Sequence, residues 1–204
     1  MLGKTHIAAG VTAALLLLHP TTVLGIGAAV AGGALGGAVC DIDCKGTKRS
    51  RDAIKGGVIA AVCIAVVIAV DLYLGNGLIN AIRNTVGTQL LCGCIGFIAC
   101  CFWGALSPHR TFTHSAVGLF LMSLCVWLVC RPLGVAVFAG MISHILLDLL
   151  NRRRIALLYP LRKPAFCLRL CDSDGVVNRV LAWGFTAVSV ILLLYFGSKV
   201  LTGR

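Results

Sequence analysis

Seven long apolar runs constrain the fold of this chain more than any other feature of its sequence. An α-helix needs about 20 residues to cross the hydrocarbon core of a bilayer, and each run is close to that length, the first and fifth marginally so. Hydrophobic residues make up 59% of the 204 and charged residues 12%, which excludes an ordinary soluble domain. We therefore predict an all-α, polytopic membrane helical bundle of about seven transmembrane helices, forming one integral membrane domain over residues 1–204. The predicted spans are Leu2–Leu18, Thr21–Cys40, Gly56–Leu74, Gln89–Leu106, Ala116–Cys130, Leu133–Leu150 and Arg179–Gly197.

The basic residues indicate how these spans are oriented. With seven crossings, 14 of the 18 lysines and arginines fall on the side of the N-terminus, and four fall on the other side. Loops rich in Lys and Arg stay in the cytoplasm, so we predict a cytoplasmic N-terminus and a C-terminus on the outer side. This topology accounts for most of the net charge of +11, and we expect no nucleic-acid partner.

The same topology places the rare polar residues at the cytoplasmic ends of the spans. The stretch Ser107–Ser115 carries two of only five histidines, and an arginine, between two apolar runs. His144 and Asp148 are four residues apart, which puts both side chains on one helix face. Imidazole and carboxylate suit Zn, Mn, Fe or Ni, so we predict a centre of two or three divalent metal ions near the cytoplasmic face, most simply zinc. The candidate ligands are His6, Asp41, Asp43, His109, His114, His144 and Asp148.

Each candidate also has a simpler interpretation that the sequence leaves open. The histidine stretch could merely cap a helix end at the headgroup level, and His6 could be an interfacial residue near a helix start. His144 and Asp148 could form an internal helix pair. Asp41 and Asp43 could simply end a helix beside a basic loop. Alternate residues of an extended turn diverge, so we expect only one of these two aspartates on a metal, and the sequence does not say which.

Four of the eleven cysteines flank polar loops as two C-x3-C pairs, Cys40/Cys44 and Cys167/Cys171. This spacing is longer than the usual C-x2-C, and the pairs are far apart in the chain. Free thiols in a reducing cytoplasm are therefore favoured over a four-cysteine zinc site. Cys40 and Cys44 remain close enough to the two aspartates to offer a soft ligand.

Small residues four apart mark the second apolar run, as Gly32/Gly36 and Gly33/Gly37. Such spacing lets helix backbones approach closely in lipid, and we predict that this helix lies at the centre of the bundle.

The order of these motifs resembles the YdjM-like family of inner-membrane proteins, LexA-regulated or related, which are described as candidate metal-dependent hydrolases. The resemblance extends from His6 to the last span, and it implies a multi-pass protein of the bacterial inner membrane with a metal site formed by the residues named above. The chain departs from the family pattern at two places. Cys44-Lys45 replaces the usual His-Pro, and Asn178 stands where relatives commonly place a glutamate. The motifs are Thr5-His6, Asp41-Ile42-Asp43, the segment His109-Arg110-Thr111-Phe112-Thr113-His114-Ser115, Ser143-His144 with Asp148, and Tyr159-Pro160.

We expect a membrane-bound metal-dependent hydrolase that uses a metal-activated water to cleave a phosphoester of a membrane lipid or another amphiphilic substrate. Asp148, Asp41 or Asp43 would accept a proton, because the sequence has no glutamate. Arg110 would neutralise a phosphoryl oxygen, and Arg152 is a further substrate-binding candidate, although its basic run could also be a topology determinant. The alternatives are a transporter of metal ions or small solutes, and a non-catalytic, stress-induced membrane scaffold.

Overall fold

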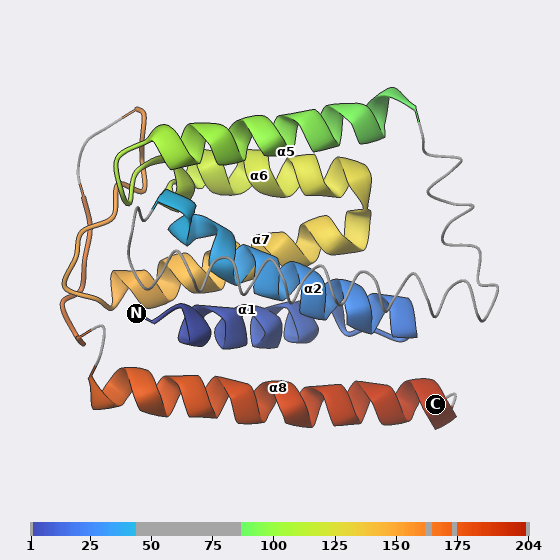
Figure 1. Ribbon diagram of the computed structural model, residues 1–204. Coiled ribbons are helices and arrows are strands. Elements are labelled where there is room, and N and C mark those ends of the chain that lie inside the picture. The colour runs from blue at the N-terminus through green and yellow to red at the C-terminus, as the bar shows by residue number, and fades with distance from the viewer. Residues whose placement is uncertain (1, 44–86, 162–164, 173–174, 203–204) are drawn as a thin grey trace.

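The computed structural model describes residues 2–43, 87–161, 165–172 and 175–202 (Figure 1). In these ranges the chain forms six α-helices and two 3-10 turns, with isolated β-bridges but no strand, which confirms the all-α prediction. The helices are α1 (Gly3–Leu18), α2 (Val23–Val39), α5 (Thr88–Leu106), α6 (Ala116–Val129), α7 (Arg131–Leu149) and α8 (Val176–Thr202). The turns are η1 (Cys40–Asp43) and η2 (Phe112–His114).

Six of the predicted spans coincide with these helices. The third, Gly56–Leu74, lies outside the described residues, so the total of seven stays a prediction. Within the described ranges, four helices are long and apolar enough to cross a membrane: α2 with η1, α5, α7 and α8. The apolar helices α1 and α6 are shorter, as expected for the first and fifth runs. The last helix begins at Val176 rather than at Arg179.

Three helices form the centre of the bundle. The helix α2 packs against both α1 and α7, while α5 and α6 lie on one side and α8 covers α1 on the other (Figure 1). Glycines allow this approach, since a Cβ atom on Gly36 would lie 2.3 Å from the carbonyl oxygen of Val137. A Cβ atom on Gly37 would lie 2.4 Å from the carbonyl oxygen of His6. The predicted central position of α2 is therefore confirmed, and any side chain at Gly37 would part α2 from the start of α1.

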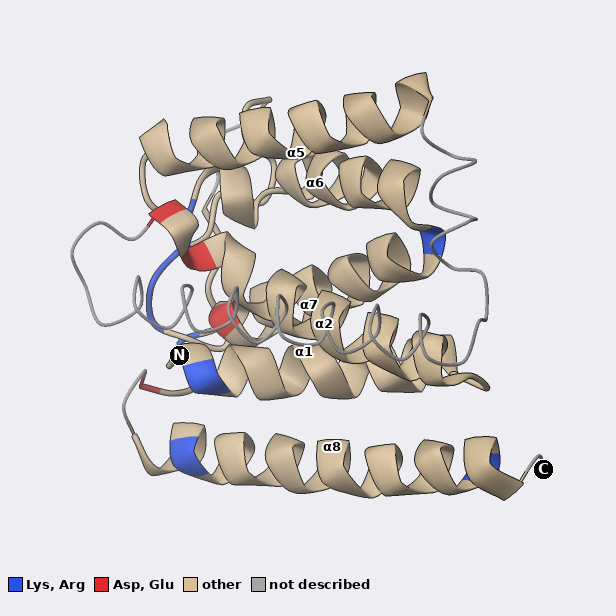
Figure 2. Ribbon diagram, turned by 45° about the vertical axis from the view of Figure 1, so that its right-hand side comes forward, with Lys and Arg blue, Asp and Glu red and all other residues tan. Residues whose placement is uncertain are grey.

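The polar groups gather at one end of this bundle. There α1, α6 and α8 begin, and α2, α5 and α7 end (Figure 1). Figure 2 shows the acidic segments of the described ribbon at this same end. The packing of the helices thus brings together residues that are as far apart in sequence as His6 and Asp148.

The segment after α7 is attached to this end by backbone hydrogen bonds. The N–H of Leu168 donates to the carbonyl oxygen of Leu149 at 2.7 Å. Ile155 and Phe166 exchange two N–H···O bonds of 2.9 Å. The N–H of Ala156 donates to the carbonyl oxygen of Arg110 at 3.1 Å. These bonds fix the segment beside the histidine stretch.

Candidate metal centre

Among the residues that the structure describes, two groups of buried side chains have the composition and spacing of metal sites. One consists of His6, His144 and Asp148, and the other of Asp41, His114 and His144. Within each group, one potential ligand atom from each residue lies within 4.8 Å of the others. All five side chains are nearly inaccessible to solvent. The structure therefore brings together five of the seven candidate ligands, from α1, η1, η2 and α7.

His144 lies at the junction of the two groups, and its orientation is fixed by the backbone of α2. Its Nδ1 lies 2.8 Å from the carbonyl oxygen of Gly37. A carbonyl only accepts, so Nδ1 carries the hydrogen and Nε2 has the lone pair. That Nε2 lies 4.0 Å from Oδ1 of Asp41 and 3.9 Å from Oδ2 of Asp148. The ring of His6 stacks on the ring of His144, with centroids 3.7 Å apart.

Asp148 is the carboxylate on which the cationic and imidazole groups converge. Its Oδ1 lies 3.3 Å from Nε2 of His6, and its Oδ2 lies 3.7 Å from Nε2 of His114. Nη2 of Arg110 donates to the same Oδ2 at 2.5 Å. An exposed charge would be solvated by water, but this carboxylate is buried and depends on these partners.

Asp43 has a different role, because its oxygens accept hydrogen bonds that hold the histidine stretch in place. Nδ1 of His109 and the backbone N–H of Arg110 each donate to it at 2.8 Å. The hydroxyl of Thr113 donates to it at 3.0 Å. Nδ1 of His114 also faces it at 3.6 Å, which leaves Nε2 of that ring directed at Asp148.

Arg110 is held in an uncommon backbone conformation. Its φ of 64° lies in the left-handed region, which residues with a side chain rarely occupy and which is often found at functional sites. Its N–H bonds Asp43 and its carbonyl oxygen accepts from Ala156, so the backbone is fixed on both sides. Its Nη1 donates to the carbonyl oxygen of Arg153 at 2.7 Å. The guanidinium is therefore aimed at Asp148 with little freedom.

The electrostatics around His114 favour a positive charge. Burial alone would lower the pKa of its ring, but the carboxylates of Asp148 and Asp43 outweigh burial and raise that pKa to about 9. The same field that retains a proton on His114 would favour a metal cation at this place.

The donor set fits a divalent metal ion. Nε2 of His114, Nε2 of His144 and Nδ1 of His6 are buried without a hydrogen-bond partner in the described part of the chain, although buried polar atoms are normally paired. Ligands about 2.0–2.1 Å from a tetrahedral zinc ion lie about 3.3 Å apart. Nε2 of His114 and Nε2 of His144 lie 3.7–4.0 Å from the aspartate oxygens, which is near this value. On His6 it is the other nitrogen, Nε2, that lies 3.3 Å from Oδ1 of Asp148. His6, His114 and His144 with Asp41 and Asp148 could therefore hold one or two ions.

The comparison with protein families agrees with this arrangement. The family model described as "YdjM inner membrane protein" matches residues 1–203. The chain belongs to the YdjM inner membrane protein family. It is therefore an inner-membrane protein, in agreement with its apolar helices of membrane length. No curated protein sequence and no solved structure gives a significant match to it.

The remaining candidates in this YdjM-family chain lie outside the two groups. Asp41 and Asp43 lie on a 3-10 turn rather than on the extended turn that we expected, and both are buried. Asp41 belongs to the second group, whereas Asp43 contacts His109 and Thr113 instead. His109 contacts Asp43 and is part of neither group. Arg152 forms an exposed ion pair of 3.0 Å with Asp172. The Sγ of Cys40 faces the carbonyl oxygen of Gly36 at 3.9 Å, and Cys44 lies outside the described residues.

Three further residues shape the site although the sequence did not single them out as ligands. Thr113 bonds Asp43, and the carbonyl of Gly37 orients His144. Asn178 is fully buried, and its Oδ1 accepts from the hydroxyl of Thr5 at 2.9 Å. It thus ties the first turn of α8 to the residue before His6. Thr113 belongs to a family motif and Asn178 is a departure from the family pattern, but nothing in the sequence pairs either residue with these partners.

Asp43→Asn should weaken metal binding by about 10–100-fold, which is the usual effect of losing a group that orients metal ligands. The amide keeps the size of the carboxylate but removes the charge that faces His109 and His114. Competition with a chromophoric chelator would measure the affinity of the purified protein. Asp172→Asn is a matched control at the same end of the bundle and should leave the affinity unchanged. An Asp43→Asn protein with unchanged affinity would contradict the orienting role.

Proposed function

We propose that this protein is a membrane-bound, metal-dependent hydrolase that cleaves a phosphoester of a membrane lipid or similar amphiphile. One observation supports this most strongly: three buried imidazoles and two carboxylates converge beside the guanidinium of Arg110. A bound divalent ion, such as Zn, Mn or Fe, would lower the pKa of water at this place toward neutrality and so provide a nucleophile. A scaffold needs no such convergence of buried charge.

The side chains of the protein would divide the work as follows. Arg110 is oriented in advance by Asp148 and by the carbonyl of Arg153, so its planar guanidinium can neutralise a phosphoryl oxygen. Asp41 or Asp148 would take up the proton released by the attacking water. Asp43 keeps Arg110 and His114 in position throughout. The apolar faces of the surrounding helices would accommodate the tail of the substrate in the lipid.

Hydrolysis should be tested on protein in nanodiscs, loaded separately with Zn, Mn and Fe. Phospholipids, lysophospholipids and polyprenyl phosphates would be offered as substrates, and released phosphate or headgroup would be measured. We expect turnover with one class, lost on chelation and in Asp148→Asn. Activity that survives both treatments would belong to other chemistry. No turnover with any metal, together with metal flux in proteoliposomes, would favour transport.

Transport is the less favoured function because of where the candidate site lies. Transport sites usually lie near the middle of the bilayer, on interrupted helices. Here the residues of the two groups lie where α1 begins and where α2 and α7 end, and Figure 2 shows the acidic segments of the described ribbon at this end. A site at one end suits a reaction at the headgroup level of one leaflet.

We propose that this end faces the cytoplasm, which the basic residues of the sequence support. A C-terminal reporter that is active only in the cytoplasm should then be silent, and one that is active only outside it should give signal. The opposite pair of results would place the candidate site at the outer leaflet and would contradict the predicted orientation, in which the N-terminus is cytoplasmic.

A further inference from the structure

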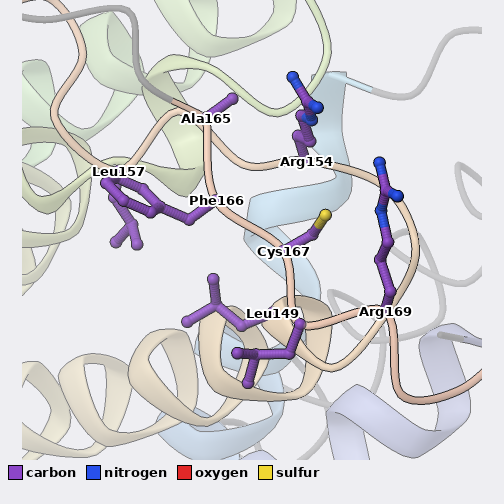
Figure 3. Close-up of a pocket in the computed structure, with 8 residues that line it drawn as sticks. Leu149, Arg154, Leu157, Ala165, Phe166, Cys167 and Arg169 are labelled. Atoms are coloured by element: carbon purple, nitrogen blue, oxygen red, sulfur yellow. The ribbon is translucent and has the colours of Figure 1, made fainter.

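A pocket of about 750 Å³ lies in the segment that follows α7, beside the candidate metal centre. This volume is within the usual range of about 300–1,000 Å³ for small-molecule sites. Its walls are of two kinds. Leu149, Leu157 and Phe166 form an apolar side, and Arg154 and Arg169 lie on the opposite side (Figure 3).

The walls of this pocket are held in place by the backbone. Leu149 and Leu168 are joined by a hydrogen bond of 2.7 Å, and Phe166 is paired with Ile155. Arg169 has a φ of 55°, in the left-handed region, between Leu168 and Leu170, which both donate to the end of α7. A residue with a side chain adopts this conformation only when its surroundings require it. The pocket is therefore formed in advance, which reduces the entropy lost on binding.

The charge on the basic side is not neutralised within the described part of the chain. The acidic residue on this segment, Asp172, is paired with Arg152 at 3.0 Å. Arg154 and Arg169 have no ion-pair partner among the described residues. Two guanidinium groups next to an apolar wall complement a molecule that has an anionic head and a hydrocarbon tail. Arginines that served only to set the topology would have no need to line a cavity.

The pocket is connected to the candidate metal centre through consecutive residues. Leu149 directly follows Asp148. Arg154 directly follows Arg153, whose carbonyl oxygen accepts from Nη1 of Arg110. A head group bound by Arg154 would therefore lie on the same short segment that positions Arg110.

We infer that this pocket binds the phosphate-bearing head of an anionic amphiphile, with the guanidinium groups of Arg154 and Arg169 on the phosphate and the tail along Leu157 and Phe166. That the bound molecule is also the substrate rests on the proposed function, whereas the binding itself does not. The pocket selects an alkyl phosphate that carries a net negative charge over free phosphate, over an uncharged alcohol and over a zwitterionic phospholipid.

Cys167 provides a direct readout, because it lines the pocket and its thiol is partly accessible. The protein in phosphatidylcholine nanodiscs would be treated with a maleimide while dodecyl phosphate is titrated in. Labelling of each cysteine would be followed by peptide mass spectrometry. Dodecyl phosphate should slow the labelling of Cys167 but not that of Cys130, which is partly accessible at the start of α7. Inorganic phosphate and dodecanol should protect Cys167 only weakly.

Arg154→Gln combined with Arg169→Gln should raise the dodecyl phosphate concentration needed for protection by about tenfold or more. Arg179→Gln is the matched control, because Arg179 is an exposed arginine on the first turn of α8 that does not line the pocket. In this variant, Cys167 should be protected at the same dodecyl phosphate concentration as in the unchanged protein. Each single variant should need a dodecyl phosphate concentration between those of the unchanged protein and the double variant. Arg154 and Arg169 are both exposed, so the fold should tolerate the changes.

Equal protection by dodecanol would overturn the anionic specificity, and equal protection by inorganic phosphate would overturn the amphiphile. Absence of protection, or full protection in the double variant, would overturn the site. Protection as expected in a protein without hydrolytic activity would keep the binding site and reject only the hydrolase. Hydrolysis without protection of Cys167 would keep the hydrolase and reject the binding site.

Discussion

Protein that carries His144→Ala together with Asp148→Asn should bind about a tenth or less of the metal that the unchanged protein binds per chain. His144 belongs to both candidate groups, and Asp148 lies 3.3–3.9 Å from the nearest nitrogen of each of the three buried histidines. The double change thus removes a ligand from every arrangement that the site allows. Elemental analysis after reconstitution with Zn, Mn or Fe would give the metal-to-chain ratio.

The stability of the variant has to be measured together with its metal content. Removing the charge of Asp148 leaves the buried guanidinium of Arg110 without its carboxylate, and breaking a buried ion pair costs about 3–5 kcal/mol. Adding Arg110→Gln removes the uncompensated cation and should recover stability without recovering metal. Asp172→Asn, which changes an exposed carboxylate, should retain the full ratio. An unchanged metal-to-chain ratio in a well-folded double variant would show that His144 and Asp148 are not metal ligands. They would then form only a structural pair within α7.

Local spacing was sufficient to predict the parts of the site that depend on a single helix. The interval of four between His144 and Asp148 places both on the buried face of α7, as the sequence indicates. The glycines of α2 also predict its central position, because only a residue without a side chain allows the observed approach to α1 and α7.

The division of labour between Asp41 and Asp43 could not be predicted in the same way. It depends on the 3-10 geometry of η1 and on which partners α7 and the histidine stretch present to each carboxylate. The tautomer of His144 likewise depends on the carbonyl of Gly37, which is 107 residues away in sequence. Such long-range contacts leave no periodic signal in the chain.

The contacts of the basic segment after α7 could not be predicted from the sequence either. Composition alone treats Arg152, Arg153 and Arg154 as equivalent, but the backbone separates them. Arg152 pairs with Asp172, the carbonyl of Arg153 holds Arg110, and Arg154 lines the pocket. The next residue, Ile155, pairs with Phe166 through the backbone, and a polar, non-periodic stretch does not predict this pairing.

Arg110→Ala should lower kcat of the metal-loaded protein roughly 30- to 1,000-fold, with KM changed much less. This corresponds to a loss of about 2–4 kcal/mol of transition-state stabilisation. The reason is that charge on the phosphoryl oxygens develops in the transition state, where a fixed guanidinium stabilises it most. The assay would use saturating metal and the substrate class identified in nanodiscs, so that weaker metal binding does not contribute to the loss.

Arg110→Lys separates this role from simple neutralisation of Asp148. Alanine and lysine meet the same left-handed backbone at φ 64° as arginine does, so strain cancels between the variants. A lysine keeps the positive charge beside Asp148 but has no planar pair of donors to bridge Asp148, the carbonyl of Arg153 and a phosphoryl oxygen. It should therefore restore metal content fully and kcat only in part. If Arg110→Lys has the kcat of the unchanged protein, or if Arg110→Ala loses activity only below saturating metal, Arg110 acts solely as the counter-ion of Asp148.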